Sequence, residues 1–425
     1  MAEGSSGFEV ALDYAVEHLD AGWPDAVREA QRGTWSQIMD EGHDPRWRLV
    51  RALNLSRAGL RTQDAIRMAR CEALASITHL DLSHNPIGDA GASALLASPH
   101  LRNLRSLNLS QCRVGNAGVA ELAASPNVAG ITRLRLAGNV IRAAGVSALV
   151  SSPHLSGLLE LDLSNNALGL EGGRALASDS GPGQLATLQL NGCEFGSVDF
   201  LAGAPWLSEL TELELLNNNL YGPSLAGLVA SPCLARLRRL ELSQNPMGDA
   251  GLLKLVGGGA PLALERLTLS DVHVTAAGVA AMANATTLGQ LQWLDLSRNH
   301  VGDAGVAALA RARGLTRLEH LDLSAASIGS VGVVALAESD AFPRLKALNL
   351  AWNGVGDPGL EALAQAPLLG GLTTLQLEYN TLIGDAGILA MATSPHLRAE
   401  LREEWKRWAV GLVRMGHLRP ELLDA

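Results

Sequence analysis

The sequence predicts an α/β solenoid, because a short phrase of apolar residues returns thirteen times at an almost constant interval. Each unit begins with a Leu-x-Leu pair and continues into a helix-like pattern such as AGVxALA. The interval is 27 residues at every step except that from Leu188 to Leu213, where it is 25. Such regularity indicates stacked units that bury their apolar faces on one another. The first leucines of the pairs are Leu53, Leu80, Leu107, Leu134, Leu161, Leu188, Leu213, Leu240, Leu267, Leu294, Leu321, Leu348 and Leu375.

Each Leu-x-Leu pair predicts a short strand, with both leucines pointing into the core and the residue between them pointing outward. An asparagine usually follows three residues after the second leucine, where its side chain can bond the loop backbone of the stack. Cys112 and Cys193 take this place in two units, which favours small buried residues over a redox role. Ala58, Val272 and Ala326 interrupt the series in three others. The asparagines are Asn85, Asn139, Asn166, Asn218, Asn245, Asn299, Asn353 and Asn380.

The recurrent GDAG phrase predicts the start of a helix, with its aspartate as the N-cap of that helix. These aspartates are Asp89, Asp249, Asp303, Asp357 and Asp385. A glycine inside a helix is unfavourable, so the recurrent second glycine indicates close packing of helix on sheet. The phrase lacks the GxxxxGK[ST] spacing of a phosphate loop, and its aspartate would repel an anion. We therefore interpret GDAG as a structural motif that starts the helix of a repeat, and not as a ligand-binding loop.

The stack is predicted to bend toward its strands. Neighbouring strands lie about 4.8 Å apart, whereas packed helices need about 8–10 Å. Thirteen such units predict an open horseshoe with a parallel sheet on the concave face and helices on the convex face. The short unit interrupts this regularity, because residues 193–224 lack a GDAG cap and carry Pro223 near the next one. We expect shortened or displaced helices there, with Phe200 and Trp206 filling the gap.

Both ends of the chain depart from the repeat. Residues 1–46 contain two amphipathic patterns, over 8–23 and 25–40, that predict a helical cap for the first unit or a separate docking module. Residues 398–425 place Leu401, Trp405 and Trp408 at helical spacing, which predicts a capping helix with its tryptophans on the last repeat. Its mixed charges make binding to a membrane surface the less favoured interpretation. The solenoid itself is predicted over residues 47–397.

Composition argues against several function classes. The formal net charge is −10, and an acidic surface repels the phosphates of nucleic acids. The four cysteines form no CxxC pair, which argues against a zinc site and favours a reducing compartment. The first residues lack the pattern of a secretory signal, and no apolar run reaches the roughly 18 residues of a membrane span. Few lysines among abundant alanine and glycine indicate a bacterial genome. We therefore expect a cytoplasmic protein without cofactor or metal.

The phrases LDLSHN, LDLSNN and LDLSRN resemble the LxLxxN core of the leucine-rich repeat family. The helical 27-residue unit is most similar to the ribonuclease-inhibitor-like class, which includes the Ran GTPase-activating protein, and GDAGxxALAxSPHLxxL resembles bacterial members. The resemblance covers residues 47–397. It implies recognition of proteins on the concave surface and on the strand-side loops. The polar residues that a GTPase-activating role would need are not matched in this sequence.

Two strands carry serine, histidine and aspartate together, which raises the question of catalysis. His320, Asp322 and Ser324 alternate along one strand, as do their counterparts at 79, 81 and 83. Alternate residues on a strand stand roughly 6.6–7 Å apart and parallel, so they do not converge on one substrate atom. The aspartate and serine also belong to the repeat phrase LDLS. We therefore predict no catalytic residues. We regard metal binding through His79, His84 or His320 as equally disfavoured.

The outward-facing rows of the late repeats form the candidate partner site. Trp293 and His320 share a row in adjacent units, Asp295 and Asp322 are the next outward residues, and Trp352 and Tyr379 share a row at the ends of the strands, with Glu378 beside Tyr379. Exposed aromatics on a sheet are unfavourable unless they meet a partner, and binding hot spots favour Trp and Tyr. The alternative is scattered surface aromatics or packing against loops.

We expect the two aromatic pairs to lie roughly 20 Å apart, a span that suits a protein interface better than a small-molecule pocket. Aromatic rings flanked by carboxylates favour a partner that presents Arg or Lys. The sequence thus predicts a non-enzymatic scaffold that binds another protein on its concave face. The alternative is a regulator of a partner enzyme, either an inhibitor or a GTPase activator, that uses the same surface.

Overall fold

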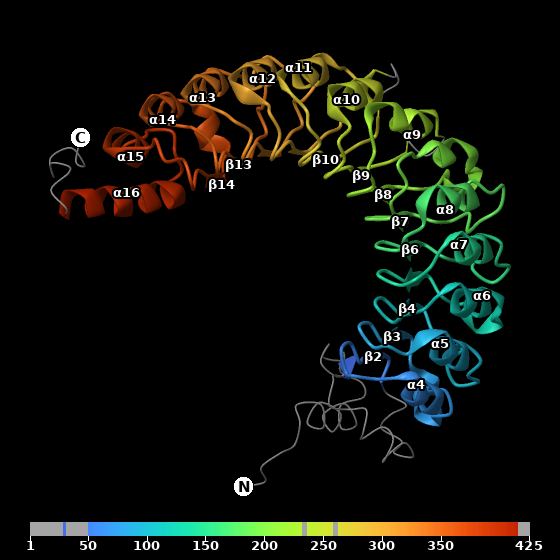
Figure 1. Ribbon diagram of the computed structural model, residues 1–425. Helices are drawn as coiled ribbons and strands as arrows, with labels where there is room; N and C mark the ends of the chain where they lie inside the picture. The colour runs from blue at the N-terminus through green and yellow to red at the C-terminus, as the bar shows by residue number, and fades with distance from the viewer. Residues whose placement is uncertain (1–28, 31–49, 232–235, 258–261, 415–425) are drawn as a thin grey trace, which may run out of the picture. The chain divides into compact units, whose positions relative to one another are not determined.

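A computed structural model describes residues 29–30, 50–231, 236–257 and 262–414, with side chains described between residues 50 and 410 of these ranges (Figure 1). The chain forms two compact units, which are described separately. Unit 1 comprises Met1–Phe195 and Phe200–Leu210, and unit 2 comprises Gly196–Asp199 and Thr211–Ala425. The division between them falls in the short repeat.

Unit 1 alternates short strands with helices of two to three turns. Consecutive strands pair in parallel, in chain order. The strands are β1 (Glu29–Ala30), β2 (Ala52–Asn54), β3 (His79–Asp81), β4 (Ser106–Asn108), β5 (Arg133–Arg135), β6 (Glu160–Asp162) and β7 (Thr187–Gln189). The helices are α4 (Thr62–Met68), α5 (Gly88–Leu96), α6 (Asn116–Ala124), α7 (Ala143–Val150) and α8 (Gly169–Leu176), with 3₁₀ segments η2 (Glu72–Ser76) and η3 (Pro126–Val128).

Unit 2 repeats the same plan and ends in a longer helix. Its strands are β8 (Glu212–Glu214), β9 (Arg239–Glu241), β10 (Arg266–Thr268), β11 (Trp293–Asp295), β12 (His320–Asp322), β13 (Ala347–Asn349) and β14 (Thr374–Gln376), again parallel and in chain order. Its helices are α9 (Ala226–Ala230), α10 (Gly248–Val256), α11 (Ala276–Asn284), α12 (Gly302–Leu309), α13 (Ser330–Ala337), α14 (Asp357–Ala364), α15 (Asp385–Ala392) and α16 (Ala399–Arg414), with 3₁₀ segments η6 (Gly222–Leu225) and η7 (Pro367–Gly371).

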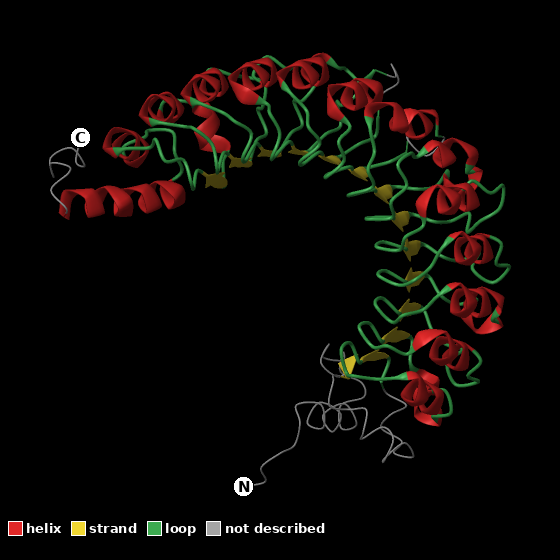
Figure 2. Ribbon diagram, in the orientation of Figure 1, coloured by secondary structure: helices red, strands yellow, loops and turns green. Residues whose placement is uncertain are grey.

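Leucine stacks on leucine from one repeat to the next, as the spacing predicted. Within each unit the central leucine of one strand pairs with that of its neighbour, for example Leu294 with Leu321. The strands line one side of each unit and the helices cover the other (Figure 2). Aliphatic side chains from both sides fill the layer between them, and most are buried completely. The 27-residue interval therefore sets the register of the sheet and of the core together.

The asparagine series forms hydrogen bonds between consecutive repeats, which confirms the role predicted for it. Asn299 is buried, and its side-chain amide donates to the carbonyls of Leu269 and Leu296 at 2.6 and 3.0 Å. Its Oδ1 accepts from the backbone N–H groups of Val272 and Val274, both at 3.1 Å. One side chain thus satisfies buried backbone groups of two successive repeats. The same bonds are made by Asn85, Asn139, Asn166, Asn245, Asn353 and Asn380.

The two cysteines in the series are buried structural residues. The Cys112 thiol donates to the carbonyl of Leu82 at 3.1 Å, which is the bond that an asparagine amide makes elsewhere. Burial raises the pKa of Cys112 to about 11 and that of Cys193 to about 12. Both thiols are therefore protonated at neutral pH and poor nucleophiles.

The aspartate of GDAG does not cap its own helix, and the prediction was wrong on this point. Asp303 lies inside the first turn of α12. Its Oδ1 accepts from the backbone N–H groups of Gly329 and Gly332, at 2.7 and 2.9 Å, and these two residues lie at the start of the helix of the next repeat. Asp89, Asp249 and Asp357 bond the next helix start in the same way. The carboxylate still lies at its own helix N-terminus, where negative charge is favourable.

This bond also explains the recurrent glycine. A Cβ on Gly332 would lie 2.7 Å from Asp303 Oδ1 and 3.0 Å from the Ile328 side chain. The glycine is therefore required by the aspartate of the preceding repeat and by its own loop, and the predicted close approach is to these groups, not to the sheet.

The short repeat is irregular, as predicted. In place of one α-helix it has two 3₁₀ segments, η4 (Asp199–Gly203) and η5 (Pro205–Leu207), and the following helix α9 has only five residues. Phe200 and Trp206 are buried, and the Trp206 indole donates to the carbonyl of Leu176 at 3.1 Å. Aromatic volume thus replaces the missing helix, because a shorter chain segment leaves space against the preceding helix.

The terminal predictions are only partly within the described residues. Of the N-terminal cap predicted over residues 1–46, the structure describes Glu29 and Ala30, which pair with β2 as strand β1 where the pattern predicted helix. The rest of that cap lies outside the described residues. At the other end α16 forms as predicted and packs beside α15. Ala409 is buried, but Trp408 is 70% exposed, so the tryptophans border a cavity instead of filling it.

We predict that Asn299→Ala lowers the free energy of unfolding by about 2–4 kcal/mol, because it leaves several buried backbone groups without partners. Asn299→Cys should cost less, since the thiol of Cys112 makes one of these bonds in its own repeat. Urea unfolding measures both, with Asn284→Ala on the exposed side of α11 as the control. An Asn299→Ala variant as stable as the control would contradict this account of the series.

We also predict that backbone amides in residues 193–224 exchange with deuterium faster than those of the flanking repeats. Short 3₁₀ segments close fewer cooperative hydrogen bonds than the helices that they replace, so local opening costs less. Hydrogen exchange with mass spectrometry resolves this segment. Exchange as slow as in α7 and α10 would show that the short repeat is no weak point.

Candidate functional site

One row of strand-side loop residues has a left-handed backbone in every repeat. Each member stands directly before the asparagine position, with φ between 50° and 63°. The row consists of Arg57, His84, Gln111, Gly138, Asn165, Gly192, Asn217, Gln244, Asp271, Arg298, Ala325, Trp352 and Tyr379. Asparagine and glycine adopt this conformation at low cost, whereas a bulky residue costs about 1–2 kcal/mol. The last two repeats nevertheless carry aromatic residues there.

Trp352 and Tyr379 stack on each other, as their shared row predicted. Their ring centroids are 3.9 Å apart and the rings are inclined by 18°. The Trp352 backbone N–H donates to the carbonyl of Glu378 at 2.9 Å, which fixes the spacing of the two repeats at this point. The side chains are 61% and 64% exposed. The pair therefore presents a rigid aromatic surface to solvent that the fold does not use as core.

Trp293 and His320 form a second stack in adjacent strands. The two residues are paired in the β11–β12 register, and their ring centroids are 4.4 Å apart with an inclination of 21°. The Arg266 guanidinium lies over the other face of Trp293, 4.0 Å from its centroid. Burial of the imidazole is the largest effect and lowers the pKa of His320. The negative charge of Glu319 raises this pKa, while the positive charges of Lys346 and Arg266 lower it further. A neutral imidazole at pH 7 follows from this environment.

Asp295 and Asp322 form the adjacent pair that the sequence predicted, but both have a structural task as well. Oδ1 of each accepts from the backbone N–H two residues later, Ser297 or Ser324, at 2.8 Å. This bond closes the end of the strand, as local aspartate turns do. Burial between the strands raises the pKa of Asp295, and the negative charges of Asp322 and Glu241 add to the effect. Only part of each carboxylate is therefore open to a ligand.

A groove of about 580 Å³ runs past the first aromatic pair. Trp352, Tyr379 and Glu378 line one end and Arg298 lines the other, with Ser324 and Asn349 between them. Sequence reasoning found the aromatic end and missed Arg298, although Arg298 belongs to the same left-handed row. The groove is therefore bipolar, with a base at one end and a carboxylate at the other.

Some carboxylates on the strand side form ion pairs, as Glu319 does with Lys346, and those of the candidate site do not. In unit 1, Glu160 bonds Arg135 at 2.7 Å and lies 3.5 Å from Arg133. Within the described part of the chain, Asp295, Asp322 and Glu378 take part in no ion pair. The late repeats thus keep negative charge available next to aromatic rings.

The arrangement of His320, Asp322 and Ser324 differs from that of a hydrolytic triad. The Ser324 hydroxyl donates to Asp322 at 2.6 Å, while the imidazole of His320 stacks on Trp293. Among the residues that the structure describes, no group of three or more His, Cys, Asp or Glu could hold a metal ion. No helix in the described ranges is long and apolar enough to cross a membrane.

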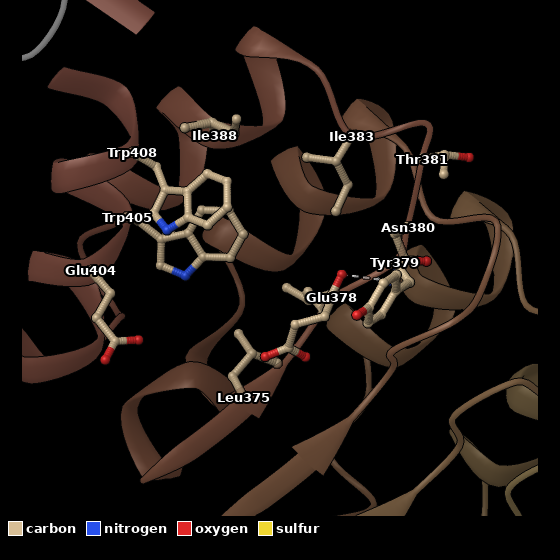
Figure 3. A pocket seen from close by; sticks show the side chains of 11 residues that line it. Leu375, Glu378, Tyr379, Asn380, Thr381, Ile383, Ile388, Glu404, Trp405 and Trp408 are labelled. Atoms are coloured by element: carbon tan, nitrogen blue, oxygen red, sulfur yellow. Dashed lines mark hydrogen bonds between the residues drawn. The ribbon is translucent and has the colours of Figure 1, made fainter. Parts of the chain in front are cut away.

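A second cavity, of about 370 Å³, lies between the last repeat and α16. Trp405 and Trp408 border it on one side, and Tyr379 and Glu378 on the other (Figure 3). Sequence reasoning placed these tryptophans against the last repeat but did not predict the open space. The spacing of the tryptophans predicts which face of α16 points toward the last repeat. It does not predict how closely α16 approaches strand β14.

These features define a repeat solenoid with aromatic and acidic surfaces at one end of its sheet. The Leucine Rich repeat family matches residues 73–96, 100–123, 131–150, 154–177, 236–256, 291–310, 315–337, 344–364 and 372–392. With the stacked strand–helix units, this match shows that the chain is a leucine-rich repeat protein. Membership of the ribonuclease-inhibitor-like class stays a prediction.

Solved structures with a similar fold come from different organisms. A chain in the yeast Rad7–Elc1 complex has 15% identity and a TM-score of 0.50, covering 93% of this chain and 98% of that chain. An internalin, InlF, from Listeria monocytogenes has 20% identity and a TM-score of 0.47, covering 79% and 92%. A TDR receptor has 17% identity and a TM-score of 0.43, covering 87% and 70%. No curated protein matches the sequence. At 15% identity the likeness to the yeast chain concerns the fold alone.

We predict that His320 titrates below the usual histidine value near 6.5 in an NMR titration. The pKa of His320 is lower in the folded state than in the unfolded state, so protonation of His320 destabilises the fold. The contribution of neutral His320 to stability is complete above about pH 6.5 and is lost as pH falls through the folded pKa. Wild type should therefore lose stability relative to His320→Gln at acid pH. Trp293→Ala should raise the pKa, since it exposes the imidazole to water. An unchanged pKa in Trp293→Ala would contradict burial as the main cause.

Proposed function

We propose that this protein is a non-enzymatic interaction scaffold that binds a partner protein on the strand side of its late repeats. The stacked, solvent-exposed pair Trp352–Tyr379 carries the proposal. Both residues occupy a position where asparagine or glycine would be more favourable for folding, and local strain of this kind gathers at functional sites. Preformed aromatic surfaces lose little side-chain entropy on binding, which is why they anchor interfaces.

The chemistry of the surface favours a partner with basic side chains. Glu378 lies beside the aromatic pair, and Asp295 and Asp322 lie near the second stack. A lysine or arginine could contact a ring face and a carboxylate together, and both contacts gain strength when water is excluded. Arg298 at the other end of the groove favours an acidic group on the same partner. This bipolar pattern would fix the orientation of the partner.

The alternative proposal is regulation of a partner enzyme through the same surface, by inhibition or by activation of a GTPase. A change in the turnover of a bound enzyme would support it, whereas binding without a rate change supports the scaffold. The cytoplasmic location, the bacterial origin and the absence of nucleic-acid and membrane binding stay predictions from composition.

We predict that the double variant Trp352→Asn, Tyr379→Asn loses partner binding and keeps a free energy of unfolding within about 1 kcal/mol of wild type. Asparagine tolerates the left-handed backbone better, which offsets the lost stacking. Affinity capture from the native host with mass spectrometry identifies the partner, and titration then compares the variants. Gln244→Asn, in the same row but outside the groove lining, is the matched control. A double variant that still binds the partner at wild-type affinity would refute the proposed contact surface.

We further predict that Asp295→Asn and Asp322→Asn weaken the binding of a basic partner without loss of fold, because the amide oxygen can still accept the bond that closes the strand. Asp322→Asn also loses the bond that Asp322 Oδ2 accepts from the Asn349 side chain, so it should be the less stable of the two. The effect should be greatest at low ionic strength. Arg133→Ala and Arg135→Ala in unit 1 serve as the comparison. A partner that tolerates the late changes and is lost with these early ones would place the site elsewhere.

A further inference from the structure

The cavity between the last repeat and α16 combines aromatic rings, aliphatic side chains and two carboxylates. Leu375 and Ile388 contribute aliphatic surface, and Trp405 and Trp408 contribute indole rings from the helix. Glu378 and Glu404 approach it from opposite sides, one from the strand-side loop and one from α16 (Figure 3). Its volume of about 370 Å³ lies within the range of ligand pockets.

The core is left open at this point. Among the described strands β2–β14, only β14 has a central leucine that is not buried, and this residue is Leu375. Trp408 above it is 70% exposed. Apolar surface held open to water costs free energy in proportion to its area. A ligand with an apolar body would cover it.

The charges around the cavity indicate the polar part of the ligand. Neither Glu378 nor Glu404 takes part in an ion pair within the described residues, and the cavity lining contains no basic side chain. Tyr379 adds a third aromatic ring at the rim. Aromatic faces with nearby carboxylates attract organic cations through the ring quadrupole and through charge. The two carboxylates would repel an anion.

We propose that this cavity is an arginine-binding pocket, in which the side chain of one arginine on a partner protein inserts its methylene stem over Leu375 and its guanidinium between the indole rings and the two carboxylates. The proposal rests on the proposed function as a scaffold for a basic partner, and it names one anchor of that interface. A planar guanidinium can stack on an indole while its N–H groups reach carboxylates on either side. Tyr379 connects this pocket to the aromatic pair, so one partner segment could occupy both.

The test uses a small probe, so its outcome does not depend on whether a partner protein is found. Binding of N-acetyl-arginine methylamide to the full chain is followed by NMR of the indole N–H signals, with the Trp408 signal assigned from Trp408→Leu. The neutral isostere N-acetyl-citrulline methylamide is titrated in parallel. We expect arginine to shift the Trp408 signal and citrulline to bind at least about five-fold more weakly, since it lacks the charge.

Three variants locate the contact. Trp408→Leu keeps an apolar side chain but removes the ring, and Glu404→Gln removes one charge; each should weaken arginine binding by about two- to thirty-fold. Glu403→Gln, on α16 but outside the cavity lining, should bind as wild type. Glu404 and Trp408 are both exposed, so these variants should fold normally, and thermal unfolding checks this.

Several results would overturn the proposal. Equal binding of arginine and citrulline would indicate an apolar occupant, and wild-type binding by Trp408→Leu would place the cation elsewhere. A concentration-dependent dimer that Trp408→Leu abolishes would assign the cavity to a second copy of the chain. If the probe binds as expected but the captured partner tolerates Trp408→Leu, the pocket binds arginine but is not an anchor of that interface. If the probe fails while the Trp352–Tyr379 variant loses the partner, only the pocket is wrong.

Discussion

The hydrogen bonds of the asparagine series are the constraint on which the rest of the structure depends. A three-residue strand has too few backbone bonds to hold a repeat in register, so the chain beyond it needs another source of order. The side chain of Asn299 supplies it by bonding backbone groups of its own repeat and of the one before. The residue before this position, Arg298 in this repeat, has a left-handed backbone, as it has also in the repeats that lack the asparagine. The proposed binding residues Trp352 and Tyr379 stand at this same position, where the turn fixes the backbone.

This geometry explains why the aromatic pairs could be predicted from the sequence. A 27-residue interval puts Trp293 beside His320 and Trp352 beside Tyr379, because residues at equal places in adjacent repeats lie at one strand spacing. Stacking follows from this proximity. The inward leucines and the irregular short repeat were predictable for the same reason, since each depends only on the length of the repeat.

The features that could not be predicted depend on how helices and side chains of one repeat pack against those of the next. The aspartate of GDAG has the signature of an N-cap, and only the structure shows that Asp303 reaches the next helix start near Gly329. The 27-residue interval places Arg266 beside Trp293, but it does not show that the guanidinium lies over the indole ring. The open space below Trp408 depends on the angle of α16, which a helical stripe leaves undetermined.

Charged side chains form ion pairs in both units, whereas Glu378 and Glu404 form none within the described residues. In unit 1 Glu160 pairs with two arginines of the neighbouring strand, and in unit 2 Glu319 pairs with Lys346. In unit 2 Glu378 and Glu404 face aromatic rings and open space. Folding alone gives no reason for this difference, since Asn165 and Gly192 show which residues the left-handed row accepts at low cost. The late repeats expose aromatic rings and carboxylates together, and we propose a binding role as the reason, because packing gives none.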